Sequence, residues 1–304
     1  MDIKRQTSST RAHILSVDVE DYFMVEAFAG SVQRSSWDSW PSRVDASTRR
    51  LLDLFDKYDV KATFFCVGWV AEKFPELIRD IHARGHELAC HSYWHRTVYS
   101  LTPAEFREDT RACVAAIEDA SGIRVRGYRA PSWSITKDSL WAFDILAEEG
   151  FTYDSSIYPI RHDLYGVPGA QRFPYTQAFG NGLTLQEFPP ATVRVLGTTL
   201  PGAGGGYLRI FPLAYTRWVF RQFERSYDQS VVVYLHPWEV DPEQPRIRDK
   251  FRSRFRHYTN LSRMHERLEY LLRNYSFVPF RSVLESESQV SLALVEKSGR
   301  RVGE

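Results

Sequence analysis

Short runs of β-forming residues alternate with amphipathic helical patterns along most of this 304-residue chain. Residues 13–19, 60–67 and 87–90 read as buried strands, and a helical pattern lies between each successive pair (residues 47–58 and 70–81). Such alternation is typical of a parallel sheet wrapped by helices, because neighbouring parallel strands need a long crossover connection. The sequence therefore predicts an α/β fold.

The same rhythm continues to residue 154 and returns near the end of the chain. Thr102 and Glu105 form a capping-box pattern with Pro103 at the first helical position, which predicts a helix to about Ser121. Gly85 is placed to end the preceding helix. Further strands are expected over residues 126–131, 151–154, 231–235 and 277–280, and further helices over 137–149, 213–227 and 261–272.

Between residues 158 and 206 the rhythm breaks. Pro and Gly become frequent and no clear helical pattern remains, so this stretch is expected to form long loops that bear function. No internal repeat or linker divides the chain, and residues 13–284 are predicted to form a single barrel-like domain. Residues 1–12 read as a polar lead, and residues 285–304 as a flexible tail.

Composition excludes several classes of protein. The formal net charge is +1, so no bulk field attracts nucleic acid or an anionic membrane. Hydrophobic residues make up 43% of the chain and charged residues 25%, which is ordinary for a globular protein. The sequence predicts a cytoplasmic protein for three reasons. Its three cysteines are widely spaced, its N-terminus is polar without a signal-like apolar stretch, and it has no segment as long as a membrane span.

Ionisable side chains follow the carboxyl ends of several predicted strands. In α/β barrels active sites collect at that edge. Two imidazoles four residues apart, with a carboxylate, leave open coordination positions on Zn²⁺ or a similar ion. Each group also has a non-catalytic interpretation. The two histidines could be a chance pair on the surface, and the acidic cluster could be a solvated turn. His236 could be an ordinary core or rim histidine, and Arg129 and Asp154 could form a structural ion pair. The side chains concerned are Asp18, Glu20, Asp21, His91, His95, Arg129, Asp154 and His236.

These segments together resemble the NodB-homology polysaccharide deacetylases, a carbohydrate esterase family that removes acetyl groups from N-acetylated glycans. The resemblance covers roughly residues 14–280 and rests on motifs that occur in the family's order. They are Thr63-Phe64-Phe65, Gly85-His86-Glu87, His91 to His95, Arg129-Ala130-Pro131, Asp154-Ser155-Ser156 and Leu235-His236. The stretches DVEDYF, YRAPSWS, YDSSIYP, GGGYLR and LHPWE resemble a narrower branch, the deacetylases of exosortase (PEP-CTERM) exopolysaccharide gene clusters.

The resemblance implies a distorted (β/α) barrel with seven or so repeats and a divalent ion held by one acidic side chain and two histidines. His91 and His95 match the two histidines. The family has two adjacent Asp residues, whereas this chain spreads its carboxylates over Asp18, Glu20 and Asp21. Strand alternation puts Asp18 and Glu20 on one side, so Asp18 is taken as the base and Glu20 as the ligand. Asp21 is the alternative ligand, and a Glu20/Asp21 base–ligand pair also remains open.

The family mechanism assigns roles to the other motif residues. Arg129 keeps Asp18 ionised while Asp18 takes a proton from the attacking water. His236 protonates the departing amine, and Asp154 holds the imidazole of His236 in the right tautomer. The family usually has Tyr after its Arg-x-Pro motif; here Ser132 occupies that position, which retains a backbone donor for the oxyanion and loses any contact from a Tyr side chain.

Four aromatic residues flank these motifs and are candidates for the wall of a sugar subsite. They are Trp94, Trp133, Tyr158 and Trp238, and ordinary packing at the rim is the alternative for each. The expected cofactor is a divalent metal ion, Zn first, with Co, Ni or Mn as alternatives. The expected partner is an N-acetylated glycan, and no nucleic acid is expected.

The predicted function is a metal-dependent hydrolase that removes N-acetyl groups from an N-acetylhexosamine-containing polysaccharide in exopolysaccharide biosynthesis. The alternatives are an allantoinase-like or O-acetyl hydrolase on the same barrel, because fold does not fix substrate, and a non-catalytic glycan-binding relative. Peripheral association with an exopolysaccharide synthesis complex would place the protein at the inner face of the membrane.

Overall fold

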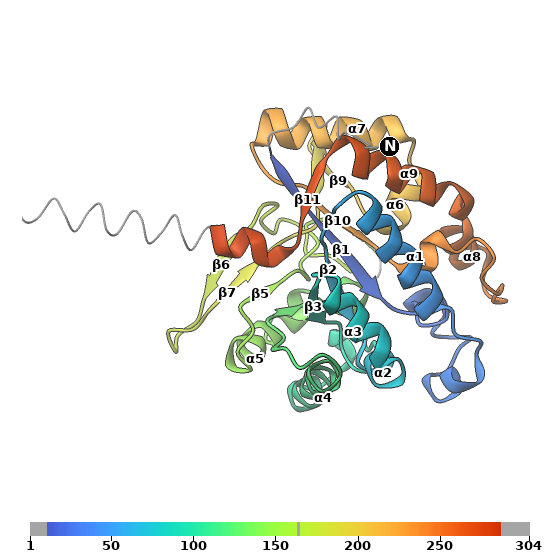
Figure 1. Cartoon of the computed structure of the whole chain (residues 1–304). Helices are drawn as coiled ribbons and strands as arrows, with labels where there is room; N and C mark the ends of the chain where they lie inside the picture. Colours follow the sequence, from blue (N-terminus) through green and yellow to red (C-terminus); the bar gives the residue numbers. More distant parts are fainter. Residues whose placement is uncertain (1–10, 163–164, 287–304) are drawn as a thin grey trace, which may run out of the picture.

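A largely parallel sheet with helices around it forms the centre of the protein (Figure 1). The structure, a computed structural model, describes residues 11–162 and 165–286. The predicted tail therefore lies almost wholly outside the described residues, as does the polar lead. The parallel strands are β1 (Ala12–Val19), β2 (Thr63–Cys66), β3 (Glu87–Cys90), β4 (Gly127–Tyr128), β5 (Tyr153–Asp154), β7 (Thr184–Glu187), β10 (Val232–Leu235) and β11 (Ser276–Val278).

The strand order is β10-β1-β2-β3-β4-β5-β7, with β6 (Tyr175–Ala178) antiparallel beside β7 and β11 beside β1. This order confirms the predicted α/β fold with a parallel sheet. The ladder does not close between β7 and β10. Within residues 11–162 and 165–286, one backbone hydrogen bond joins the two sides there, from the amide of Ala191 to the carbonyl of Val232 at 3.4 Å. The barrel is accordingly distorted, with its one open seam after β7.

The helices lie mostly where the sequence predicts them. They are α1 (Val44–Lys57), α2 (Gly68–Lys73), α3 (Pro75–Ala83), α4 (Pro103–Ser121), α5 (Ala142–Glu148), α6 (Gly205–Ile210), α7 (Leu213–Gln222), α8 (Phe251–Tyr258) and α9 (Leu261–Asn274). Helix α4 has the expected capping box between Thr102 and Glu105, and it ends at Gly122 in the left-handed conformation (φ 73°). Within the described ranges, none of these helices has both the length and the apolar character needed to cross a bilayer.

The single helix predicted over residues 70–81 is in fact two helices. Pro75 begins α3, and Phe74 before it leaves the helical region with φ −128° and ψ 58°. A proline lacks the N–H that an uninterrupted helix requires, and it disfavours the helical conformation in the residue before it. The apolar periodicity runs across this break, which is why the pattern alone suggested one helix.

The stretch expected to form long loops contains two β-hairpins instead. One joins β6 to β7, and the other joins β8 (Thr192–Val195) to β9 (Thr198–Pro201). Leu196 and Gly197 make the second turn with φ of 47° and 81°. Two consecutive positive φ values are those of a type I′ turn, which matches the twist of a two-stranded hairpin. Each of these strands is only four residues long, and none is an unbroken run of buried residues that would mark it in the sequence.

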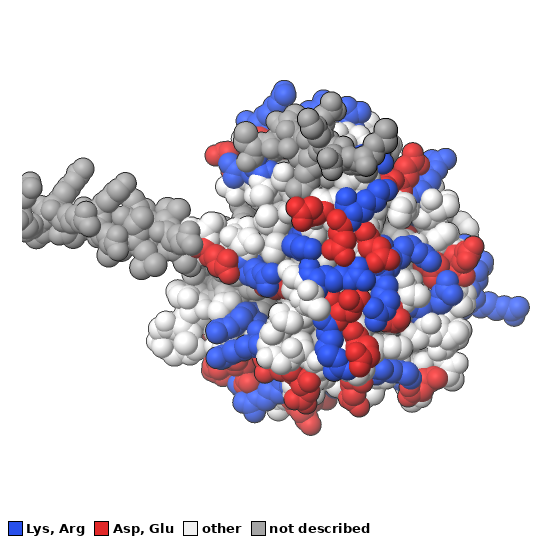
Figure 2. Space-filling view, viewed as in Figure 1, with Lys and Arg blue, Asp and Glu red and all other residues white. Residues whose placement is uncertain are grey.

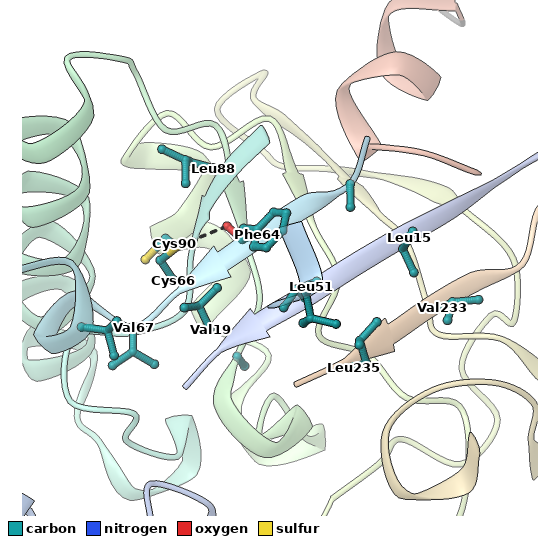
Figure 3. Packing of buried hydrophobic residues seen from close by; sticks show 14 of the residues in the cluster. Leu15, Val19, Leu51, Phe64, Cys66, Val67, Leu88, Cys90, Val233 and Leu235 are labelled. Atoms are coloured by element: carbon teal, nitrogen blue, oxygen red, sulfur yellow. Dashed lines mark hydrogen bonds between the residues drawn. The ribbon is translucent and has the colours of Figure 1, made fainter. Parts of the chain in front are cut away.

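The core lies between the sheet and the surrounding helices, as Figure 3 shows for Leu15, Phe64, Leu51 and their neighbours. Cys66 and Cys90 are opposite each other in the β2–β3 register and are both buried and free. Burial raises the pKa of the Cys66 thiol well above its usual range, and its Sγ lies 3.6 Å from the carbonyl oxygen of Phe64 (Figure 3). These thiols act as small core residues.

Candidate active site

The register of the parallel strands brings residues from distant parts of the chain to one edge of the sheet. Val19, Cys66, Cys90, Tyr128 and Asp154 are successive partners across β1 to β5. The residue that follows each strand therefore lies at the same level, and three of these residues are Glu20, His91 and Arg129. Val17 pairs with Leu235, so His236 lies level with Asp18.

Glu20, His91 and His95 form the cluster suited to a metal ion among the described residues. One ligand atom from each lies within 4.8 Å of the others, and all three side chains are buried. The Nδ1 of His91 donates a hydrogen bond to the carbonyl of Arg129 at 2.8 Å, which leaves its Nε2 lone pair free to bind a cation. Nε2 of His95 lies 2.5 Å from Oε2 of Glu20.

The histidine pair is held in a tight turn rather than on a helix. Ser92 and His95 both have positive φ, at 64° and 49°. The carboxylate of Asp109 on α4 accepts hydrogen bonds from Ser92 Oγ at 2.7 Å and from the backbone N–H of Tyr93 at 2.8 Å. Residues other than glycine rarely adopt this backbone conformation unless the surrounding structure holds them in it. The hydrogen bonds to Asp109 hold the turn in this way.

Electrostatics in the cluster favour a neutral histidine beside a charged glutamate. Burial lowers the pKa of His91 to about 4, against the raising effect of Asp18. Burial alone would raise the pKa of Glu20, but the charges of His95 and His236 outweigh it and lower that pKa below its usual range. An ionised carboxylate with a neutral imidazole is the donor set that divalent ions bind.

Asp18 is held beside a buried guanidinium. Nη1 of Arg129 donates to Oδ1 of Asp18 at 2.6 Å and to Ser16 Oγ at 2.8 Å. The rest of the guanidinium donates to the backbone carbonyl and the hydroxyl of Ser155. The ring of Phe65 lies under it at 4.1 Å. An ionised Asp18 therefore has a fixed counter-charge, with its second oxygen left toward His236.

His236 lies near both carboxylates of β1 and is oriented by a third. Its Nε2 is 3.6 Å from Oε1 of Glu20 and 3.9 Å from Oδ2 of Asp18. Its Nδ1 donates to Oε2 of Glu239 at 3.2 Å, and Oε1 of Glu239 accepts from Nε of Arg209 at 2.7 Å. Burial disfavours the imidazolium, but the charges of Glu20 and Glu239 outweigh it and raise the pKa of His236 to about 9.

The contact with His236 that the sequence assigned to Asp154 is made by Glu239. Asp154 accepts from Ser156 Oγ at 2.6 Å, and the carboxyl of Glu187 on β7 is its other neighbour. Burial and the adjacent Asp154 carboxylate hold the pKa of Glu187 well above its usual range. Ser156 Oγ in turn accepts from the backbone N–H of Ala130 at 2.8 Å, so Asp154 supports the Arg129–Ala130 turn rather than the imidazole.

Asp21, the alternative ligand, is directed away from the cluster. Its Oδ2 accepts from Ser42 Oγ at 2.5 Å and from the backbone N–H of Arg43 at 2.9 Å and Val44 at 3.2 Å. A carboxylate that accepts backbone donors at the start of a helix stabilises that helix. The structure thus places Asp21 at the beginning of α1 and Glu20 beside the histidines.

A cavity of about 370 Å³ opens above these groups, within the usual size range of ligand pockets. Asp18, Glu20, His91, His95 and His236 share its lining with Ser132, Trp133 and Trp238. Trp238 stacks on His236 at 4.9 Å and its indole N–H donates to Oε1 of Glu20 at 3.1 Å.

Two of the four candidate subsite aromatics lie elsewhere. Tyr158 is fully buried behind Trp133, with ring centroids 5.4 Å apart. Trp94 packs on Trp37 at the surface. Neither residue lines the cavity.

One wall of the cavity comes from residues that the sequence did not single out as site residues. Tyr207, Arg209 and Ile210 of α6 line it, together with Arg256 and His257 of α8. A Cβ at Gly204 or Gly205 would lie 2.2 or 2.8 Å from the ring of Tyr234, so only glycine allows α6 this close to β10. A signal for Glu239 was present in the sequence, three residues after His236.

Comparisons with known proteins divide the chain into two matched segments. Residues 34–153 match the sequence profile of the family described as "Polysaccharide deacetylase", and residues 155–285 match one described as "Domain of unknown function". A peptidoglycan deacetylase of Helicobacter pylori is 34% identical over 108 residues, which is 36% of this chain and 36% of that protein. The matched region is thus about a third of the length of that relative.

Two solved structures share the fold. One is from a Mycobacterium smegmatis protein assigned as a polysaccharide deacetylase, with a TM-score of 0.62, 22% identity, and coverage of 94% of this chain and 93% of that one. The other is Puue allantoinase, with a TM-score of 0.56, 16% identity, and coverage of 88% and 86%. Over residues 34–153, which include His91, His95 and Arg129, the chain is similar to the polysaccharide deacetylase family.

Proposed function

We propose that this protein is a metal-dependent hydrolase that removes N-acetyl groups from an N-acetylhexosamine-containing polysaccharide. The main support for the proposal is that three groups of interacting side chains line the same cavity. They are the Glu20–His91–His95 cluster, the Asp18–Arg129 pair and His236 with its carboxylate Glu239. A hydrolase of amides needs a polarising centre, a base for water and an acid for the leaving amine.

The cluster fits a divalent ion by its chemistry. Glu20 is buried with its Oε2 beside Nε2 of His95 at 2.5 Å, and Nδ1 of His91 donates to a backbone carbonyl, which leaves Nε2 of His91 to bind. Two nitrogens and one oxygen suit Zn²⁺, with Co, Ni and Mn as further possibilities. Such an ion supplies Lewis-acid polarisation of the amide carbonyl and of the attacking water.

Asp18 is the proposed base. Arg129 donates to one oxygen of its carboxylate and supplies a fixed counter-charge, and the other oxygen faces the cavity side where His236 lies. A carboxylate held in this way can take a proton from water without rearranging. Ser132, which has φ 53° at the cavity wall, is proposed to place a backbone N–H against the oxyanion.

His236 is the proposed acid. Glu239 accepts the Nδ1 proton, so Nε2 is the nitrogen that exchanges a proton with the substrate. A raised pKa keeps the ring protonated until the amine departs. Glu239 is itself fixed by Arg209, and the pKa of Glu239 falls to about 2 because this guanidinium and His236 outweigh the raising effect of burial.

The proposed substrate class follows from the family and from the peptidoglycan deacetylase relative, whose name states its own substrate. An exopolysaccharide carrying N-acetylhexosamine is the specific proposal. Residues 13–284 are proposed to act as one domain, because both matched segments contribute strands to the same sheet.

The test is metal analysis combined with acetate release from N-acetylglucosamine oligomers. The purified chain is expected to contain about one divalent ion, to lose acetate release when a chelator removes it, and to recover with Zn²⁺ or Co²⁺. O-acetylated oligomers and allantoin, assayed in parallel, separate the alternative hydrolases. Acetate release that is indifferent to complete metal removal would contradict the proposal.

A further inference from the structure

We propose that residues 246–256, called here the cationic segment, form a docking surface for an anionic lipid bilayer. The segment contains six cations, Arg246, Arg248, Lys250, Arg252, Arg254 and Arg256, and one anion, Asp249. The whole chain carries a net charge of only +1. Positive charge is therefore concentrated here against an otherwise balanced composition.

Two phenylalanines project from the middle of this segment. Phe251 is 79% exposed and Phe255 is 50% exposed, and their rings stack with centroids 6.1 Å apart. Large side chains of this kind normally bury their surface. A stacked pair left in solvent is an apolar ridge that can enter another apolar phase.

The packing of α8 turns this ridge outward. His257, which is buried, and Tyr258 rest on the ring of Phe28, at 4.8 Å and 6.0 Å. At 3.6 residues per turn, Phe251 and Phe255 share a face away from His257, with Arg252 and Arg254 on its two flanks. An apolar ridge between cationic flanks is the arrangement of a helix that lies in a membrane interface.

The cations of the segment lack the acidic partners found elsewhere on the molecule. Arg84, for example, bonds Asp53, Asp56 and Asp80, and the face seen in Figure 2 shows acidic and basic side chains interspersed. In the described ranges, no carboxylate lies within ion-pair distance of the exposed side chains from Arg248 to Arg256. Asp249 bonds Ser31 Oγ at 2.6 Å instead.

An anionic bilayer can interact with both the cations and the exposed phenylalanines of this surface. Anionic headgroups attract unpaired Lys and Arg, and Phe side chains enter the boundary of the acyl chains. A soluble acidic polysaccharide would use the cations but would leave the phenylalanine ridge in water. The exposed ridge is thus the observation that favours lipid.

The segment also borders the cavity, because Arg256 contributes to the cavity wall. Docking through α8 would hold the mouth of the cavity close to the lipid surface. If the proposed deacetylase function is correct, glycans held at a membrane are then the favoured substrates.

The experiment measures binding of the full chain to phosphatidylcholine vesicles with and without phosphatidylglycerol, by cosedimentation at low and high salt. The variants are F251S/F255S and R252E/R254E, which change exposed side chains outside the cavity lining. The matched control is R194E/L196S at the tip of the β8–β9 hairpin, where Leu196 is fully exposed. Thermal unfolding of each variant verifies that it is folded.

The wild-type chain should bind only the anionic vesicles, more weakly at high salt. Each double variant should bind at least about tenfold more weakly, and the control should match the wild type. Absence of binding to anionic vesicles at low salt would overturn the proposal. The proposal would also be overturned if F251S/F255S bound as well as the wild type and a soluble polyuronate bound equally well. That result would identify an acidic polysaccharide as the ligand.

The two proposals fail independently. Acetate release from soluble oligomers by F251S/F255S should equal that of the wild type whether or not lipid binds. Vesicle binding needs no catalysis, so a protein that binds lipid but releases no acetate would contradict the deacetylase proposal alone.

Discussion

The part of the chain up to residue 153 and the part after it contribute different things to the same cavity. The first part supplies the Glu20–His91–His95 cluster and the Asp18–Arg129 pair, all within one network of buried polar contacts. The second part supplies His236 with Glu239, the α6 wall and the cationic segment. Under the proposed function, the first part would hold the ion and the base, and the second part would supply the proton donor and one wall of the cavity.

His91→Ala is expected to have the largest effect on activity. Loss of one of three ligands should remove the ion and reduce acetate release by about a thousandfold or more, because both polarisation and water activation depend on the centre. Metal content and single-turnover acetate release are the measurements. A variant that retains the full metal content would show that the cluster is not the ion site.

His236→Ala should separate metal binding, assigned to the first part of the chain, from proton donation, assigned to the second. The variant is expected to keep its metal and to lose about 10²- to 10⁴-fold in turnover of the amide substrate. Hydrolysis of p-nitrophenyl acetate, whose leaving group needs no proton, should fall much less. His91→Ala is the control, since it should lose both reactions; equal metal loss in the two variants would refute the separate roles.

Glu239→Gln tests whether the imidazole is oriented from within the second part. The amide of Gln can still accept from Arg209 but no longer provides the charge that stabilises imidazolium. We expect kcat to fall about tenfold with KM and metal content nearly unchanged, and p-nitrophenyl acetate hydrolysis to be preserved. Asp154→Asn is the comparison variant, and a selective loss of proton donation there would instead support the assignment made from the sequence.

The smallest predicted effect concerns a histidine of the first part that lies outside the cavity. Nδ1 of His86 accepts the backbone N–H of Ala62 at 3.1 Å, and burial lowers the pKa of His86 to about 4 from 6.5. The unfolded chain therefore binds the proton first as pH falls. His86 contributes stability that is complete above about pH 6.5 and is lost toward pH 4, by about 1–3 kcal/mol.

His86→Asn keeps an acceptor oxygen near the position of Nδ1 but does not titrate. Its free energy of unfolding, measured by urea denaturation from pH 4 to 7, should vary less steeply with pH than that of the wild type. His265→Asn, at an exposed position on α9, is the matched control and should leave the slope unchanged. An unaltered slope in His86→Asn would show that another buried histidine dominates.

Local signals in the sequence predicted local structure well. The capping box at Thr102, the strand over residues 87–90 and the α/β order all depend on residues close together in the chain, and the structure confirms them. The β-hairpins after residue 170 were missed because their strands are only four residues long and two of them, β6 and β9, have no buried residue. The assignment of site residues to catalytic roles stays a prediction.

Contacts between distant residues were harder to foresee. Asp109 fixes the turn of His91 to His95 from α4, and nothing in its own helical surroundings marks it as a polar support. Asp154 ends β5 and Glu239 follows β10, and only the three-dimensional arrangement shows which carboxylate meets the imidazole. The α6 wall depends on glycines whose need becomes visible beside Tyr234.

Because Gly204 and Gly205 pack directly against Tyr234, the α6 wall of the cavity and the end of β10 cannot move independently. A methyl group added at either glycine must displace the Tyr234 ring, and that ring touches Trp133 at 4.8 Å and lies 6.0 Å from His236. Substitutions that enlarge this loop would therefore also disturb the surroundings of His236, the proposed acid. Redesign of specificity would have to begin further out, at Tyr207 and Ile210.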